Sequence, residues 1–135
     1  MKILEQRVKE QNAITRPVKP ASIDALQAEL GFPLSAEYRE YLSLFGVIAH
    51  DAYETYGLGV PDDYYLHVLN AYKDLAADAS YPANTVPLLE VGDGQYYLYN
   101  NHTQQVMLWA TPNGGIVQVL DESLEVFLNN HIFSS

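Results

Sequence analysis

Four apolar runs of strand length follow one another after Pro82, and turn-forming residues separate each run from the next. The runs are TVPLLEV (85–91), QYYLYN (95–100), QQVMLWA (104–110) and GIVQVLD (115–121), and the separators are Gly-Asp-Gly, Asn-His-Thr and Pro-Asn-Gly-Gly. Such short connections join antiparallel neighbours, because a parallel pair needs a crossover of a dozen or more residues. The second half of the chain is therefore predicted to form an antiparallel meander.

The first separator, Gly92-Asp93-Gly94, also raises the question of a ligand-binding loop. Glycine loops that bind phosphate direct backbone N–H groups at the anion, usually at a helix N-terminus and beside a Lys or Arg. Here a β-prone run follows, and no Lys or Arg occurs after Lys73. Because Asp-Gly tolerates the positive φ angles of a tight hairpin, we predict a structural turn.

Helical spacing of apolar residues marks four segments. The first starts near Ser22 and stops at Gly31, and the second starts at the predicted N-cap Ser35 and stops at Gly46. A third is expected from Asp62 or Asp63, as cap, to about Asp78, and a last one from Asp121 or Ser123 to about residue 132. Between residues 47 and 61 the pattern is weaker and suits a strand or two with a loop.

These elements predict an α+β fold: a single domain over residues 1–135, with a mostly antiparallel sheet of about four to six strands flanked by helices. The chain has 135 residues, of which 48% are hydrophobic, so it can bury an ordinary core. It has no cysteine, which suits a reducing compartment. Charges interrupt the apolar residues of the first segment, which is typical of neither a signal peptide nor a membrane span. We expect a soluble, cytoplasmic protein.

Acidic residues dominate the last two thirds of the chain. The net charge is −10, and residues 40–135 hold twelve acidic residues against one basic residue, Lys73. A field of this sign repels nucleic acid and anionic lipid, so we expect neither nucleic acid nor membrane as a partner. If the acids share a face they attract a basic protein, and if they are spread out they serve solubility.

The sequence offers little for catalysis or for cofactors. The four histidines have no partner at metal-ligand spacing, and no serine lies in a Gly-x-Ser-x-Gly elbow. Asp62 and Asp63 are adjacent acids that could serve a hydrolase, but neighbours before a helix are ordinarily cap and dipole partners. We therefore expect no enzyme activity, no catalytic residues, no metal and no cofactor.

Tyrosine is the most distinctive residue type, with eleven copies. Exposed tyrosines surrounded by acids are typical of protein-binding surfaces. The stretch DAYETYGLGVPDDYY (51–65) predicts such a surface, and its candidate partner-binding residues are Asp51, Tyr53, Glu54, Tyr56, Asp62, Asp63, Tyr64 and Tyr65. The alternative is that the aspartates cap a helix and the tyrosines face the core, as we expect for Tyr38, Tyr41, Tyr72, Tyr97 and Tyr99. Trp109 is also expected to be buried against the helical layer.

The order of these motifs resembles the SUKH superfamily. The pair of helices in IDALQAELGFPLSAEYREYLSLFG resembles the family's opening signature, and ETYGL (54–58) is similar to its Glu-x-x-Gly step. VPLLEVGDGQYYLYN, QVMLWA and SLEVFL are similar to its Gly-Asp-Gly strand, its tryptophan strand and its closing helix. The similarity spans residues 20–132 and is nearest to the SUKH-1 type branch, shared by fungal cell-wall-synthesis regulators and many small bacterial proteins.

This resemblance implies one mostly antiparallel sheet flanked by helices, without catalytic residues. Single-domain bacterial members are mostly regarded as immunity proteins that neutralise a cognate toxin domain, often a nuclease. The fungal regulators carry long flanking disordered segments, so the brevity of this chain favours immunity. We expect a non-enzymatic inhibitor of a basic toxin domain, and the alternative is an intracellular scaffold that docks a cellular enzyme. The resemblance implies no particular interface.

Overall fold

Five helices and seven strands make up residues 1–133, the part of the chain that this computed structural model describes. The helices are α1 (Lys2–Glu10), α2 (Pro20–Leu30), α3 (Ala36–Leu44), α4 (Val68–Leu75) and α5 (Leu124–Ile132). The strands are β1 (Ile14–Thr15), β2 (Ile48–His50), β3 (Tyr53–Glu54), β4 (Thr85–Gly92), β5 (Gln95–Asn100), β6 (Gln105–Ala110) and β7 (Gly115–Leu120).

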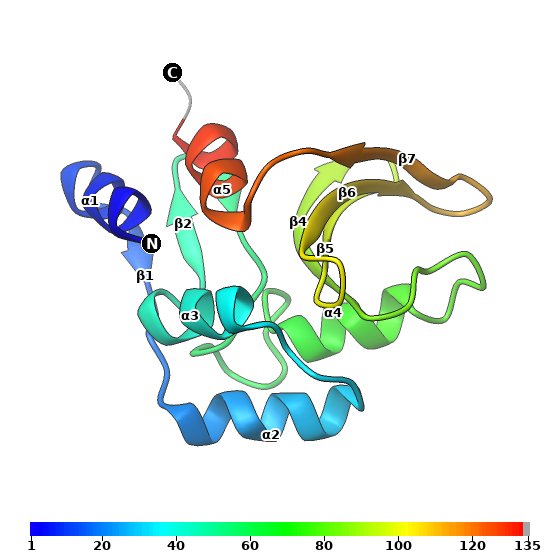
Figure 1. The fold of residues 1–135 in the computed structure, drawn as a ribbon, viewed down its shortest axis with the longest axis horizontal. Coiled ribbons are helices and arrows are strands. Elements are labelled where there is room, and N and C mark those ends of the chain that lie inside the picture. Colours follow the sequence, from blue (N-terminus) through cyan, green and yellow to red (C-terminus); the bar gives the residue numbers. More distant parts are fainter. Residues whose placement is uncertain (134–135) are drawn as a thin grey trace.

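The strands form two antiparallel sheets, so the α+β class is confirmed. Strands β4-β5-β6-β7 pair in sequence order, which confirms the predicted meander, and β1-β2-β3 form a small second sheet. The expected strands are thus divided between two sheets, which lie side by side in Figure 1. The three short strands bury few residues of their own, so the second sheet depends on its neighbours.

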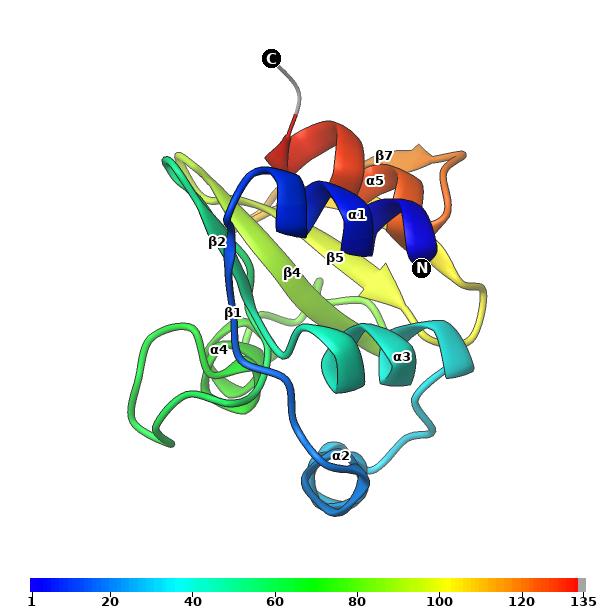
Figure 2. The same ribbon diagram turned by 90° about the vertical axis from the view of Figure 1, so that its left-hand side faces the viewer.

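Helices cover both faces of the four-stranded sheet (Figure 2). On one face Tyr99 stacks on Tyr38 of α3 with ring centroids 5.8 Å apart, and Tyr97 meets Phe127 of α5 at 4.8 Å. On the other face α4 lies below the sheet and contributes Leu75 to a small cluster around Trp109. The main core lies between α3, α5 and the first of these faces.

Local signals explain the ends of α2 and α3. Ser35 accepts a hydrogen bond from the backbone N–H of Tyr38 at 3.1 Å, which confirms it as the N-cap of α3. Gly31 ends α2 in the left-handed region at φ 80°. Helix α2 begins at Pro20, two residues before the predicted cap Ser22, because proline with its fixed φ suits a first helical position.

The predicted start of the third helix is wrong. Helix α4 begins at Val68, with His67 at the N-cap position, and not at Asp62 or Asp63. Gly57 N–H donates to the Leu66 carbonyl, and Val68 N–H donates to the Gly57 carbonyl, both at 2.9 Å. Because these contacts engage the backbone on both sides of His67, residues 62–67 form a loop and do not extend the helix.

The Gly-Asp-Gly separator is a hairpin turn, as predicted. Strand β4 ends at Gly92 and β5 begins at Gln95, and the two turn residues Asp93 and Gly94 have φ angles of 53° and 76°. Two consecutive positive φ angles are the requirement of a type I′ turn, which matches the twist of the strands it joins.

A buried cluster of hydrogen bonds around Thr55 joins the two sheets. The Thr55 hydroxyl lies 2.6 Å from the Tyr41 hydroxyl and accepts from the Ile48 N–H at 2.8 Å. The Tyr41 hydroxyl donates to the Tyr56 carbonyl at 2.9 Å, and the Tyr56 N–H donates to the Leu88 carbonyl of β4 at 2.8 Å. The segment after β3 is thereby fastened to α3, β2 and β4 at once.

Gly57, two residues after Thr55, must be glycine because the backbone of Gly46 lies very close to it. A Cβ atom at Gly57 would lie 1.6 Å from the carbonyl oxygen of Gly46. No side chain fits in that space, so the chain can pass between the two sheets only with glycine at this position.

Thr55→Val is expected to destabilise the protein by about 1–3 kcal/mol, because the near-isosteric valine leaves the buried Ile48 N–H without an acceptor. Thr55→Ser is the matched control, since it keeps the hydroxyl and should cost only about 1 kcal/mol for the lost methyl group. Urea denaturation of the three proteins measures both values. A serine variant as unstable as the valine variant would show that the methyl group matters and the hydrogen bonds do not.

Trp109 is fully buried, as the sequence predicts. Its indole packs with Leu98 and Met107. Its Nε1–H donates to Ser80, and the nitrogen lies 3.2 Å from both the carbonyl and the hydroxyl oxygen of that residue. Tyr81 meets the indole edge-on at 5.2 Å. The tryptophan therefore holds the segment after α4 against the sheet.

Trp109→Ala is expected to cost about 3–5 kcal/mol of unfolding free energy, the usual range for emptying a large aromatic site in a core. Trp109→Phe should cost less, because it keeps most of the apolar volume and loses the bond to Ser80. Thermal and urea unfolding followed by circular dichroism measure both variants. An alanine variant with an unchanged unfolding midpoint would contradict the packing role.

Candidate functional site

The acidic and tyrosine-rich stretch 51–65 crosses the second sheet and then loops outward before α4. Most of its eight candidate residues are exposed, namely Asp51, Tyr53, Asp62, Asp63, Tyr64 and Tyr65, and Glu54 is half-buried. Tyr56 is different, because only 8% of its surface is accessible. For Tyr56 the alternative interpretation applies, a tyrosine that faces the core, since its backbone bridges the two sheets and draws its ring inward.

Tyr65 stands on the surface in a defined orientation. Its hydroxyl donates to the Glu54 carboxylate, at 2.7 Å from Oε1 and 2.6 Å from Oε2, and its ring centroid lies 4.6 Å from that of Tyr64. The hydrogen bond to Glu54 is the main reason why the pKa of the Tyr65 phenol is raised. The loop and β3 are therefore tied together across the surface.

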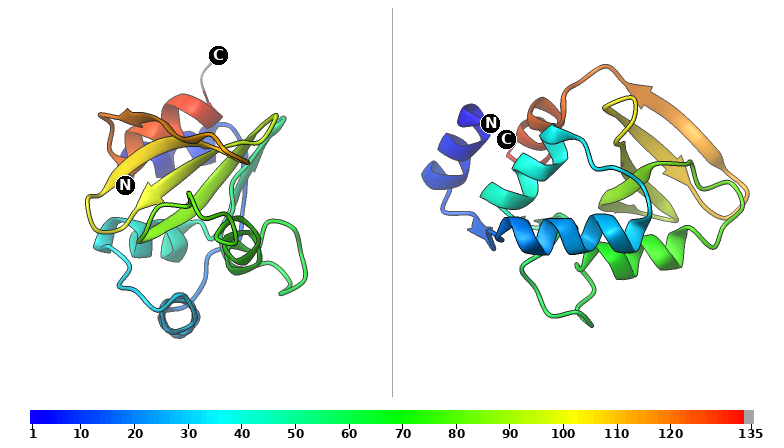
Figure 3. Two further views of the ribbon diagram at one scale, coloured as in Figure 1. Left: turned by 90° about the vertical axis from the view of Figure 1, so that its right-hand side faces the viewer. Right: turned by 60° about the horizontal axis from the view of Figure 1, so that its bottom comes forward.

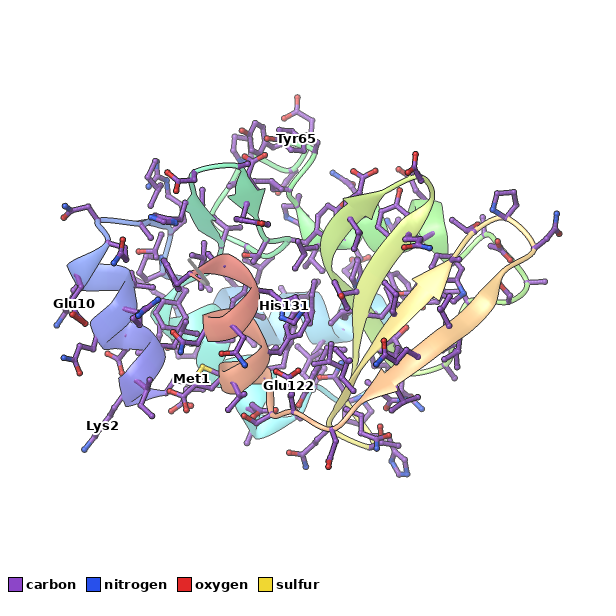
Figure 4. The ribbon with its side chains drawn as sticks, turned by 90° about the horizontal axis from the view of Figure 1, so that it is seen from above. Met1, Lys2, Glu10, Tyr65, Glu122 and His131 are labelled. Atoms are coloured by element: carbon purple, nitrogen blue, oxygen red, sulfur yellow. The ribbon has the colours of Figure 1, made fainter. Side chains whose placement is uncertain are left out.

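One hollow opens between the β2–β3 hairpin and the edge of β4. Its volume is about 650 Å³, and Tyr53, Glu54 and Tyr65 line one wall. Glu90 and Val91 of β4 line the opposite wall, and Tyr97 and His131 are also among the lining residues. Figure 4 labels Tyr65 at the outer margin of the molecule and His131 on α5.

A second hollow adjoins the first on the side of α4. Its volume is about 530 Å³, and its walls come from the loop, α4 and the sheet, with the lining residues Tyr56, Asp63, Tyr64, Tyr65, Asn70, Ala71, Lys73, Asp74, Leu75, Glu90 and Tyr96. Tyr56, Tyr65 and Glu90 line both hollows, so the two lie side by side and share these residues as a common wall. We call the two hollows together the tyrosine groove.

The tyrosine groove is acidic as well as aromatic. Its lining includes the four carboxylates of Glu54, Asp63, Asp74 and Glu90 against one lysine, Lys73. Burial is the main cause of the raised pKa of Tyr56, and the charges of Glu90 and Asp74 add to it. Glu90 likewise adds to the effect of burial in raising the pKa of Tyr96. The groove thus suits a cation that stacks on aromatic rings.

Asp51 and Asp62 lie outside the tyrosine groove. Asp51 sits at the tip of the β2–β3 turn with φ 52°, and its carboxylate is 3.8 Å from His50 Nδ1. Asp62 lines a third hollow of about 590 Å³ beside α2, with its carboxylate 3.6 Å from His67 Nε2. Asp62 and Asp63 thus line different hollows, and neither caps a helix as the alternative interpretation required.

Most of the residues that line the groove were not anticipated from the sequence. Asp74, Glu90 and Tyr96 belong to it although they are distant in sequence from residues 51–65, and Tyr97, expected in the core, is half-buried and also lines it. The position of Glu90 just before the Gly-Asp-Gly turn marks it as exposed at a strand end. Nothing local indicates that β4 lies beside β3, because the bond from Tyr56 to Leu88 creates that contact.

The described residues show no obvious metal site. Within residues 1–133, no group of three or more His, Asp and Glu side chains is arranged to hold a metal ion. His131 stacks on Phe127 at 4.2 Å, and its Nδ1 lies 3.0 Å from the Phe127 carbonyl. Over the same residues, no helix has the length and apolar composition needed to cross a membrane.

Comparison with known proteins identifies the family. A crystal structure of a protein from Pseudomonas syringae pv. tomato superposes with a TM-score of 0.81 at 12% identity, covering 100% of both chains, so the two share a fold. No curated protein matches in sequence. The model of the SUKH_5 family, described as "SMI1-KNR4 cell-wall", matches residues 1–133. The resemblance seen in the sequence motifs is thereby confirmed at the level of the superfamily, and the chain belongs to the SUKH_5 family.

Proposed function

We propose that this protein is a non-enzymatic immunity protein that binds and neutralises a basic toxin domain in the cytoplasm, and that the tyrosine groove receives the toxin. The observation that carries the proposal is the groove itself: two adjoining hollows with tyrosine walls and four carboxylates against one lysine. Tyrosines give large contact area at a low entropy cost, and carboxylates between them select basic side chains.

The groove is suited to arginine or lysine side chains that project from the partner. A guanidinium group can stack on a tyrosine ring while a carboxylate accepts its hydrogen bonds. A nuclease toxin carries such side chains where it binds phosphate, so an acidic inhibitor can approach that site quickly and cover it. The net charge of −10 has the sign that this steering requires.

Family membership supports the proposal at a coarser level. The SUKH_5 family, with its SMI1-KNR4 description, fits an immunity-type or a cell-wall-related protein. The cell-wall description favours a second candidate function, an intracellular scaffold that docks a cellular enzyme without inhibiting it.

A co-expression experiment separates the two candidates. The C-terminal domain encoded by the neighbouring open reading frame is expressed alone and together with this protein. Immunity predicts that the domain is lethal alone and tolerated in the presence of this protein. A neighbourhood without any lethal domain, together with failure to rescue cells from a panel of toxins, would contradict immunity and favour the scaffold.

Reversing two charges in the groove is expected to slow association with the toxin. Asp63→Lys with Asp74→Lys should lower the association rate constant by about tenfold at low salt and flatten its salt dependence, because exposed acids act mainly by steering. The matched control is Glu10→Lys with Asp121→Lys, which makes the same change in net charge outside the groove. Stopped-flow kinetics measure both pairs, and equal effects would assign the steering to overall charge.

Removing the Tyr65 ring is expected to speed dissociation. Tyr65→Ala should raise the dissociation rate constant by about thirtyfold, equivalent to roughly 2 kcal/mol, if the ring is a central anchor. Tyr65→Phe keeps the ring and loses the bond to Glu54, so its effect should be smaller. Because 59% of Tyr65 is exposed, neither variant should change the melting temperature by more than a few degrees. Unchanged dissociation in the alanine variant would remove Tyr65 from the interface.

A further inference from the structure

The four-stranded sheet has one protected edge and one open edge. At the first edge, the Tyr56 N–H donates to the Leu88 carbonyl, so β4 is covered by the segment that joins the two sheets. At the other edge, β7 pairs with β6 on one side only, and no strand of residues 1–133 pairs with its second side. Figure 3 shows β7 along the outer rim of the molecule.

The open edge is apolar and exposed. Ile116 and Val117 each expose 53% of their surface and Val119 exposes 48%. Proteins usually protect such an edge with lysine, proline, inward-pointing charge or a β-bulge, and of these the strand sequence GIVQVL has only a bulge, at Val117. The bulge at Val117 interrupts the register of β7 against β6. Ile116 pairs with Trp109 and Val119 pairs with Met107, and because of the bulge the side chains of Ile116 and Val119 lie on the same face of the sheet.

This edge is also the uncharged part of an acidic protein. Residues 94–120 contain no Asp, Glu, Lys or Arg, although the net charge of the chain is −10. Two copies of the chain repel one another wherever their acidic surfaces meet. At β7 that repulsion is reduced, because β7 and its neighbours β5 and β6 carry no charged side chain, so the exposed apolar edge suits a second copy better than it suits a charged partner.

We propose that two copies of this chain associate through β7, with the two β7 strands antiparallel, so that the two four-stranded sheets become one continuous sheet. When the strands are centred on one another, Ile116 of each copy lies opposite Val119 of the other, which forms two apolar cross-strand pairs. Asp121 of one copy then lies opposite Gly114 of the other. The two Asp121 residues are offset by seven positions, about 24 Å, which exceeds the screening length at physiological salt.

Sedimentation velocity over a concentration series tests the association. The wild-type protein should show a reversible dimer, and Val119→Lys should weaken dimerisation by at least about tenfold, because it places a charge in each cross-strand pair. Ile3→Lys is the control, since Ile3 is 64% exposed on α1 and lies away from β7. Circular dichroism should show that both variants remain folded. A wild-type protein that stays monomeric up to about 1 mM would overturn the proposal.

Cysteine cross-linking tests the register, because the natural chain has no cysteine. A mixture of Ile116→Cys and Val119→Cys proteins should form a disulfide-linked dimer under mild oxidation. Neither variant alone should form this dimer, because its two identical cysteines, one in each copy, are then offset along the strands by about 10 Å, beyond the roughly 7 Å between Cα atoms that a disulfide spans. Cross-linking of each single variant as readily as of the mixture would exclude this register. Neither experiment involves a toxin, so both results are independent of the proposed function.

Discussion

The hydrogen bonds around Thr55 are the interaction on which the rest of the structure depends. The three strands of the second sheet are two or three residues long and lack the area to be stable alone. They are held because the Thr55 hydroxyl joins Tyr41 of α3 to Ile48 of β2, and because the next residue pairs with β4. All of these groups are buried, so each bond that is lost leaves a polar atom without water or partner.

The position of the tyrosine groove follows from this junction. One wall belongs to β3 and the loop before α4, and the other to β4, β5 and α4. The two walls face each other only because residues 55–57 pass from one sheet to the other at this point. Tyr56 is part of the junction and also lines both hollows, which links the stability of the fold to the shape of the groove.

Local patterns predicted the elements that depend on neighbours in sequence. The cap at Ser35, the stop at Gly31 and the Asp93-Gly94 turn each require only a few adjacent residues, and all three are present. The start of α4 was missed because its preceding backbone pairs with Gly57, about ten residues away along the chain. The far wall of the groove was missed for the same kind of reason, since Glu90 and Asp74 meet the tyrosine stretch through tertiary contacts alone.

The residues that hold the backbone, Thr55 and Gly57, are different from the exposed side chains, and this has a consequence for how such a protein can evolve. Tyr53, Asp63, Tyr64 and Tyr65 project outward from a segment whose backbone is held by Thr55 and Gly57. Surface substitutions usually change stability by less than about 0.5 kcal/mol, whereas Thr55 and Gly57 tolerate few substitutions. Selection can therefore exchange the outward residues one at a time while the fold persists. A lineage can acquire a new recognition specificity through single mutations without passing through an unfolded intermediate.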